Sequence, residues 1–86
     1  METTDVIVRL KRIIIDSMQL SVDLDSIIGK DLIAELGINS VDALEIMVWI
    51  ENTFDIQIPD EDLDSSLLRE IEHLANYIIA RRKVQA

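Results

Sequence analysis

Apolar side chains recur at intervals of three and four residues in three stretches of the chain, a period that predicts amphipathic α-helices. The first stretch begins after polar residues that mark a helix start. The stripes predict a first helix with apolar positions from Val6 to Met18 after a start marked by Thr3, Thr4 and Asp5, a second over about residues 40–54, and a last helix that starts near residue 69 or 70. Val8 and Ile15 lie off the first stripe, so both are expected at the surface.

Two connections interrupt this helical pattern. The period is lost from Gln19 to Asn39, where polar residues and Gly29 indicate a long loop that interspersed aliphatic residues pin to the core. A loop of this length in a small domain points to a function or to an extra turn of helix. Further on, Pro59 precedes a run of acidic residues, which predicts a short third helix from Asp60 to about Ser65.

Composition supports a helical fold. The chain has 86 residues, 49% of them hydrophobic and only 3% aromatic, with two glycines and one proline. We therefore expect one domain over residues 1–86 of the all-α class: a four-helix bundle with three main helices, a short third helix and a long first loop. The absence of cysteine leaves packing as the source of stability. No apolar run approaches the length of a membrane span, so we expect a cytoplasmic protein.

Charge is distributed unevenly. The formal net charge is −9, and no lysine or arginine occurs between Asp31 and Leu68. Such an acidic stretch argues against nucleic acid as a partner and favours partners with basic surfaces. From charge alone, a generic solubilising surface is the simpler explanation.

The predicted helix over residues 40–54 has two apolar faces. Ala43, Ile46, Met47, Ile50 and Phe54 form the face expected in the core. The second face is an apolar stripe formed by Val41, Leu44 and Val48. Its polar, mostly acidic rim is formed by Asp42, Glu45, Glu51 and Asn52. Either the helix is buried on nearly all sides or the stripe is an exposed recognition surface. We favour exposure, because so many carboxylates are rarely buried.

Trp49 points to a third side of the same predicted helix. Its ring is either a partner contact or a cover over the long loop. Nothing in the sequence pairs it with a partner, so we expect a packing role.

Ser40 is the residue that carries the most functional interest. It follows Gly37-Ile38-Asn39 at the start of the predicted helix. A serine there is ordinarily a cap, but Asn39 is an equally good cap one position earlier. Ser40 would then occupy the first helical position with an outward, unused hydroxyl.

Templates for catalysis and metal binding are incomplete. His73 is the only histidine, and it lies opposite the apolar stripe of the last helix. We therefore expect it at the surface rather than beside Ser40, where it could act as a base. Asp60, Asp62 and Asp64 have the opening spacing of a calcium loop, but the glycine and glutamate that such a loop needs are missing. We expect neither an enzyme nor a metal site.

One family resemblance covers essentially the whole chain. The run Glu35-Leu36-Gly37-Ile38-Asn39-Ser40-Val41-Asp42, followed by Glu45, Phe54-Asp55-Ile56, Ile58-Pro59-Asp60-Glu61 and Asn76-Tyr77-Ile78, resembles the acyl carrier protein family. The match is specific from Leu36 to Asp60, whereas the helical stripes alone would suit many small bundles.

The resemblance implies a cofactor and two surfaces. In this family the serine that matches Ser40 receives a 4′-phosphopantetheine arm from coenzyme A, and the arm's thiol carries acyl groups as thioesters. The implied contacts with basic patches of partner enzymes are Val41, Asp42, Leu44, Glu45, Val48 and Glu51. Residues implied to line an acyl-chain pocket, which core packing would explain equally well, are Ile46, Ile50, Phe54, Ile58, Leu63 and Leu68.

The resemblance implies a monomeric carrier. Its implied partners are a phosphopantetheinyl transferase and acyl-transfer, condensing or ligase enzymes.

The sequence departs from the family pattern at three places. Asn39 stands where aspartate is usual, Trp49 is bulky where many members have a small residue, and the segment over residues 62–71 is longer than the common form. These departures suit a specialised carrier. The resemblance fits fatty acid synthesis as well as a separate polyketide, peptide or lipid-tailoring pathway, and nothing in the sequence selects the acyl group. The alternative is a binding module of the same fold that uses its acidic stripe without a prosthetic group.

Overall fold

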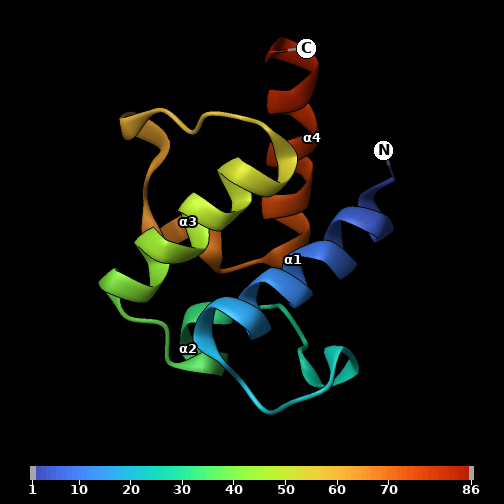
Figure 1. Cartoon of the computed structure of the whole chain (residues 1–86), viewed down its shortest axis with the longest axis vertical. Helices are drawn as coiled ribbons and strands as arrows, with labels where there is room; N and C mark the ends of the chain where they lie inside the picture. The colour runs from blue at the N-terminus through green and yellow to red at the C-terminus, as the bar shows by residue number, and fades with distance from the viewer. Residues whose placement is uncertain (1, 86) are drawn as a thin grey trace.

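The computed structural model describes residues 2–85, and every regular element in that range is helical (Figure 1). The all-α prediction is confirmed. The α-helices are α1 (Thr3–Met18), α2 (Leu32–Leu36), α3 (Ser40–Phe54) and α4 (Ile71–Gln85). Short 3-10 helices are η1 (Leu24–Ser26), η2 (Asp60–Asp62) and η3 (Ser65–Leu68).

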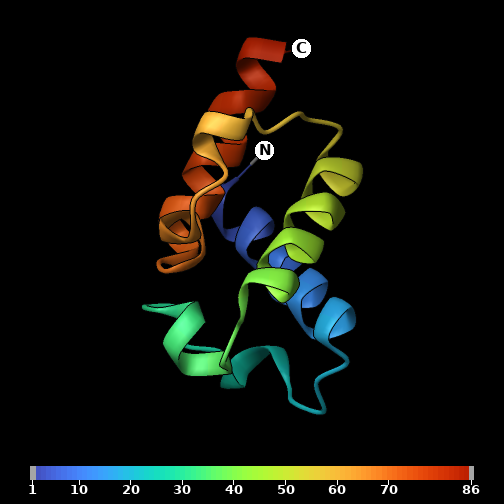
Figure 2. The same ribbon diagram turned by 90° about the vertical axis from the view of Figure 1, so that its left-hand side faces the viewer.

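The three long helices enclose the core, with α1 in contact with both α3 and α4 (Figures 1 and 2). Their expected apolar stripes are buried, and each helix contributes fully buried side chains: Val6, Leu10, Ile14, Ile46, Ile50, Phe54, Leu74 and Ile78. Burial of these apolar side chains, each worth roughly 1.5–3 kcal/mol, is the main source of stability in a chain without disulfides.

Ile15 does not follow the expectation for α1. Val8 is exposed as predicted, but Ile15 is buried, so that prediction was wrong. The chain folds back after α1: the Leu20 amide donates to the Ile15 carbonyl at 2.9 Å, and η1 lies against α1. Leu20 and Leu24 pack against the core there, so the end of α1 is covered on more than one side.

The first connection, residues 19–39, contains the extra helical turn that its length suggested. This turn is α2, and the Asp31 side chain caps it by accepting from the Ala34 amide at 3.3 Å. The Glu35 carboxylate accepts from the amides of Ile28 at 2.7 Å and Gly29 at 2.9 Å. These two bonds tie the loop that precedes α2 to α2 itself.

Backbone hydrogen bonds join the first connection to the segment before α4. The Ile71 amide donates to the Gly29 carbonyl at 2.8 Å, and the Leu32 amide donates to the Arg69 carbonyl at 2.8 Å. Gly29 is buried with φ +83°, and a Cβ there would overlap Ile71 Cγ2. Only glycine therefore fits this contact without a shift of Ile71 or of the backbone.

The second connection, residues 55–70, departs from the predicted third helix. Instead of one helix over Asp60–Ser65, two 3-10 turns form, closed by Leu63 to Asp60 and Leu67 to Asp64 backbone bonds at 3.1 and 3.0 Å. Adjacent carboxylates repel one another, and so short a segment offers little propagation to offset helix nucleation, which favours isolated turns.

Side chains of α4 hold the second connection. The Tyr77 hydroxyl donates to Asp62 Oδ2 at 2.6 Å. Arg81 Nη2 donates to the Gln57 carbonyl at 3.3 Å, and Arg82 Nη1 donates to the Phe54 carbonyl at 3.2 Å. The two arginines thus satisfy carbonyls at and after the end of α3.

Within residues 2–85, no helix is long and apolar enough to cross a membrane.

Candidate functional site

Ser40 is the first residue of α3 and is exposed to solvent. Asn39 is the cap, as predicted: its Oδ1 accepts from the Asp42 amide at 2.8 Å. Asp42 Oδ2 accepts in return from the Asn39 amide at 3.4 Å, which completes a capping box. The Ser40 hydroxyl makes no hydrogen bond to any residue of the described range 2–85.

The start of α3 stabilises an anion beside Ser40. It does so with backbone amides and the helix dipole rather than with a positively charged side chain. The first amides of a helix lack intrahelical partners, and in α3 only that of Asp42 is taken by the Asn39 side chain. The positive end of the helix dipole adds to this. A phosphodiester on Ser40 therefore fits the helix start without lysine or arginine, which are absent from residues 31–68.

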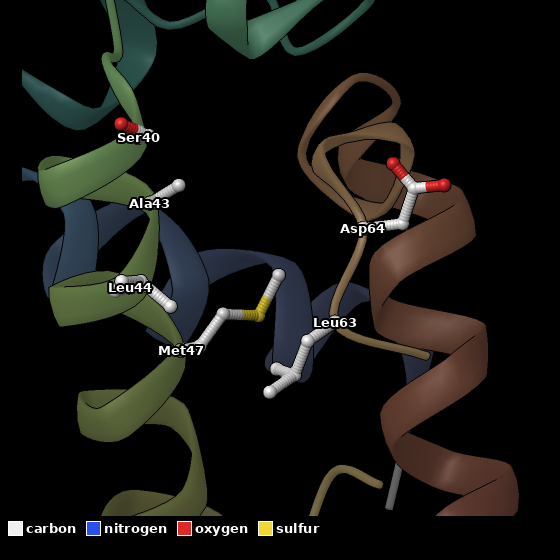
Figure 3. Close-up of a pocket in the computed structure, with 6 residues that line it drawn as sticks. All are labelled: Ser40, Ala43, Leu44, Met47, Leu63 and Asp64. Atoms are coloured by element: carbon white, nitrogen blue, oxygen red, sulfur yellow. The ribbon is translucent and has the colours of Figure 1, made fainter. Parts of the chain in front are cut away.

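An apolar hollow of about 230 Å³ begins beside Ser40. One wall is α3 and the other is the second connection; its lining residues are Ser40, Ala43, Leu44, Met47, Leu63 and Asp64. Figure 3 shows the side chains of Met47 and Leu63 pointing toward each other from the two walls, with Ser40 at one end. The hollow thus places apolar surface beside the serine.

Of the residues expected to line an acyl pocket, Leu63 alone lines this hollow. The other five lie in the closed core: Ile46, Ile50, Phe54, Ile58 and Leu68. Met47 and Ala43 were expected only as core residues. Ala43 and Met47 line the hollow, whereas Ile46 and Ile50 do not, because of the path that the second connection takes past α3. Helical periodicity does not predict that path.

The apolar stripe of α3 is exposed, so the prediction of exposure is confirmed. Val41 is 69% exposed, Leu44 59% and Val48 53%. Glu45 is exposed beside them and makes no hydrogen bond or ion pair within the described residues. An aliphatic surface with a free carboxylate at its edge suits a partner that presents basic and apolar side chains.

The other two acidic residues of this surface have contacts within the protein. Asp42 belongs to the capping box, and Glu51 Oε2 accepts from the Ile58 amide at 2.9 Å. The Glu51 contact holds the chain that leaves α3. It was missed because a bond between residues seven apart across a helix end has no local signature.

Trp49 and His73 lie apart from the Ser40 hollow. Trp49 is 38% exposed and lines a groove with Leu24 of the first connection and with residues of α1, so its ring lies on the side of the helix that faces that loop. His73 is exposed on α4, also as expected. Within residues 2–85, no group of three or more histidine, aspartate or glutamate side chains is placed to hold a metal ion.

A small helical bundle that presents an unpaired serine hydroxyl at a helix start, beside an apolar hollow, has the features of a carrier domain. The family model described as "Phosphopantetheine attachment site" matches residues 9–78. The chain belongs to the acyl carrier protein family, whose cofactor is 4′-phosphopantetheine. Family membership makes it a carrier rather than an enzyme.

Relatives named "Acyl carrier protein" cover most of the chain. That of Campylobacter lari is 37% identical over 70 residues, which span 80% of this chain and 86% of the relative. That of Bdellovibrio bacteriovorus is 34% identical over 76 residues, 87% of this chain and 92% of the relative. That of Campylobacter jejuni strain RM1221 is 39% identical over 61 residues, 70% of this chain and 77% of the relative.

Proposed function

We propose that Ser40 carries the 4′-phosphopantetheine arm and that the protein presents acyl intermediates to cytoplasmic enzymes of fatty acid, polyketide or related lipid biosynthesis. The observation that carries this proposal is the exposed Ser40 hydroxyl, which no described residue engages. The arm supplies a terminal thiol that holds acyl groups as thioesters.

Attachment requires a partner enzyme. Ser40 Oγ bonds to the phosphorus that carries the pantetheine, the pyrophosphate P–O bond of coenzyme A breaks, and adenosine 3′,5′-bisphosphate leaves. The hydroxyl proton is released, and no side chain in the described range is bonded to that hydroxyl to accept it. A phosphopantetheinyl transferase therefore supplies the base as well as coenzyme A. On this view the carrier contributes position: the capping box fixes the backbone at residue 40 and the exposed site admits the enzyme.

The exposed stripe of α3 is the surface proposed for docking. Its aliphatic members supply contact area and its carboxylates attract basic patches on the transferase and on acyl-transfer, condensing or ligase enzymes. The residues are Val41, Asp42, Leu44, Glu45, Val48 and Glu51. Glu45 is the carboxylate most available to a partner, because the carboxylates of Asp42 and Glu51 accept hydrogen bonds from backbone amides of the protein itself.

The hollow beside Ser40 is the proposed entrance for an acyl chain. At about 230 Å³ it is smaller than the roughly 300–1,000 Å³ of pockets that bury drug-sized ligands. It suits part of a chain between Met47 and Leu63. A longer chain reaches Ile46, Ile50, Phe54, Ile58 and Leu68 only if the second connection moves away from α3.

Mass spectrometry tests the attachment residue. Incubation with a phosphopantetheinyl transferase and coenzyme A should add one phosphopantetheine to the protein and none to Ser40→Ala. Ser21→Ala, at an exposed serine of the first connection, is the matched control and should be modified normally. Lack of modification with several transferases, or modification of Ser40→Ala, would refute the assignment.

The apolar stripe of α3 is exposed, and its exposure does not depend on Ser40. This observation favours a second candidate, a binding module without a prosthetic group. It predicts that Ser40→Ala leaves affinity for a transferase or acyl-transfer enzyme and biological activity unchanged, whereas Glu45→Lys weakens binding. Loss of activity in Ser40→Ala with intact binding would exclude this alternative.

A further inference from the structure

A surface groove between α1 and α3 lies outside the Ser40 hollow and outside the stripe of α3. We call it the Trp49 groove; its lining includes Val8, Arg9, Arg12, Leu24, Trp49 and Thr53. Its members come from α1, η1 and α3, so the fold rather than a local sequence motif assembles it.

The groove exposes large apolar side chains. Val8 is 52% exposed and Trp49 is 38% exposed, although the core beneath them is closed. A partly exposed tryptophan beside aliphatic side chains is a common centre of protein interfaces, because its ring contributes much contact area with few rotatable bonds. This apolar content makes the groove suitable for contact with a polypeptide.

Charge identifies the partner chemistry. Residues 31–68 contain no cation, so α3 has none of its own, and α1 brings Arg9 and Arg12 to the groove. Both arginines are exposed and make no hydrogen bond or ion pair within residues 2–85, unlike Arg81 and Arg82, which bind carbonyls. The carboxylate in the lining is that of Asp16. The groove is thus a basic region on a chain of net charge −9.

We propose that the Trp49 groove docks an acidic, amphipathic segment of a partner enzyme, with apolar side chains on Trp49 and Val8 and carboxylates facing Arg9 and Arg12. The identity of the partner as an enzyme rests on the proposed carrier function; the surface itself does not need Ser40.

This second surface restricts the choice of partner. Trp49 follows Val48 on α3, so the groove begins about 100° around the helix from the exposed stripe. A partner that covers both must present a basic group to Glu45 and an acidic group to the arginines of α1. An enzyme with a uniformly basic patch gains from the stripe alone and is repelled at the groove.

Intrinsic fluorescence reports occupation of the groove, because Trp49 is the only tryptophan. The probes are two synthetic amphipathic helical peptides with identical leucine positions, flanked in one by glutamate and in the other by lysine. The glutamate peptide should shift Trp49 emission and perturb the amide resonances of Val8 and Arg12. The lysine peptide should perturb Val41, Leu44 and Val48 instead.

Charge-reversal variants provide the matched comparison. The double variant Arg9→Glu with Arg12→Glu should weaken glutamate-peptide binding roughly tenfold. Lys11→Glu with Lys30→Glu makes the same charge change at residues that line a different hollow, and should leave binding within about twofold of the original. Circular dichroism checks that both variants remain helical.

Several outcomes would overturn the proposal. One is no Trp49 response to the glutamate peptide at concentrations up to about 1 mM; another is equal weakening in the two double variants. A response to protein concentration alone would assign the groove to a second copy. The unmutated protein separates the two proposals: peptide binding without arm attachment supports the groove alone, and arm attachment without peptide binding supports the carrier alone. Ser40→Ala should bind the glutamate peptide as the unmutated protein does.

Discussion

The two connections that flank α3 are held to the rest of the molecule by different chemistry. The first, residues 19–39, is joined to the segment before α4 by backbone bonds at Gly29 and Leu32, and within itself by the Glu35 carboxylate. The second, residues 55–70, shares the bond between Leu32 and Arg69 at its end. Its middle part is held by side chains: the Glu51 carboxylate accepts from the Ile58 amide, and Tyr77 and Arg81 of α4 donate to Asp62 and to the Gln57 carbonyl.

Because of this difference, the first connection holds Ser40 in position and the second connection can adapt to a bound chain. Backbone bonds around a buried glycine leave few alternative arrangements, so the segment that leads to Ser40 is fixed. Long side chains have several rotamers, and partly exposed bonds to them are each worth only about 1 kcal/mol. The wall of the Ser40 hollow that carries Leu63 is therefore the part expected to yield to a bound chain.

The largest effect is expected from breaking the first connection at its tightest point. Gly29→Ala places a Cβ against Ile71 Cγ2 at a φ that disfavours alanine, and should lower the unfolding free energy by about 3 kcal/mol in urea melts. Gly37→Ala is the control: φ is also positive, +66°, but no atom lies within 4 Å of the new Cβ, so the loss should be only about 1 kcal/mol. Equal losses would show that the Ile71 contact is unimportant.

Removing the charge of Glu35 should weaken the same connection less. Glu35→Gln keeps the side-chain shape but replaces a carboxylate that accepts two amide bonds with an amide that has one acceptor oxygen. We expect a loss of about 1.5 kcal/mol, discounted for solvent exposure, and faster hydrogen exchange at the Ile28 and Gly29 amides. Glu45→Gln, at an exposed carboxylate of α3 that makes no hydrogen bond within the described residues, should change neither measurement.

Removing one α4 tether tests the second connection. Tyr77→Phe loses the bond to Asp62 and should cost about 1 kcal/mol at neutral pH. Faster amide exchange should be confined to the second connection. If exchange also increased around Gly29, the two connections would not be independent.

The same tyrosine gives the second connection a pH dependence. Burial, and then the hydrogen bond to the Asp62 carboxylate, raise the pKa of Tyr77 from its ordinary 10.0 to about 12. The unfolded chain loses this proton first, so the stabilisation is complete below pH 10 and declines as the pH rises to about 12. Because Tyr77 is the only tyrosine, tyrosinate absorbance in folded and urea-unfolded protein measures both values directly.

The smallest effect is expected from salt. Screening of the carboxylates between Asp31 and Asp64 should raise stability by roughly 0.5 kcal/mol, seen as a modest rise in melting temperature with sodium chloride or a divalent cation. The gain should appear mainly as slower amide exchange in the second connection. A melting temperature insensitive to both additives would mean that these charges are well separated.

Local patterns predicted the helices that set up the site. The Asn39 cap and the stripe up to Phe54 gave the bounds of α3, and Asp55 ends it with φ +55°. Exposure of Val41 and Val48 followed from the acidic residues near them. The spare hydroxyl of Ser40 followed from the presence of a better-placed cap.

What was missed depends on contacts between distant segments. Ile15 is buried because the chain turns back over it, and Met47 rather than Ile50 lines the hollow because of the path of the second connection. The bonds of Glu35 and Arg82 join residues that share no periodic pattern. The length of the first connection suggested an extra turn of helix, but α2 has only five residues, too few for an apolar stripe to give its position.

The cap of α3 is an amide rather than a carboxylate. An aspartate in that position would lose its negative charge in mild acid and hold the Asp42 amide less well, but Asn39 does not ionise. Its half of the capping box therefore keeps the same strength in acidic and neutral surroundings. The amide that holds the backbone beside Ser40 is therefore the same group at every pH that the folded protein meets.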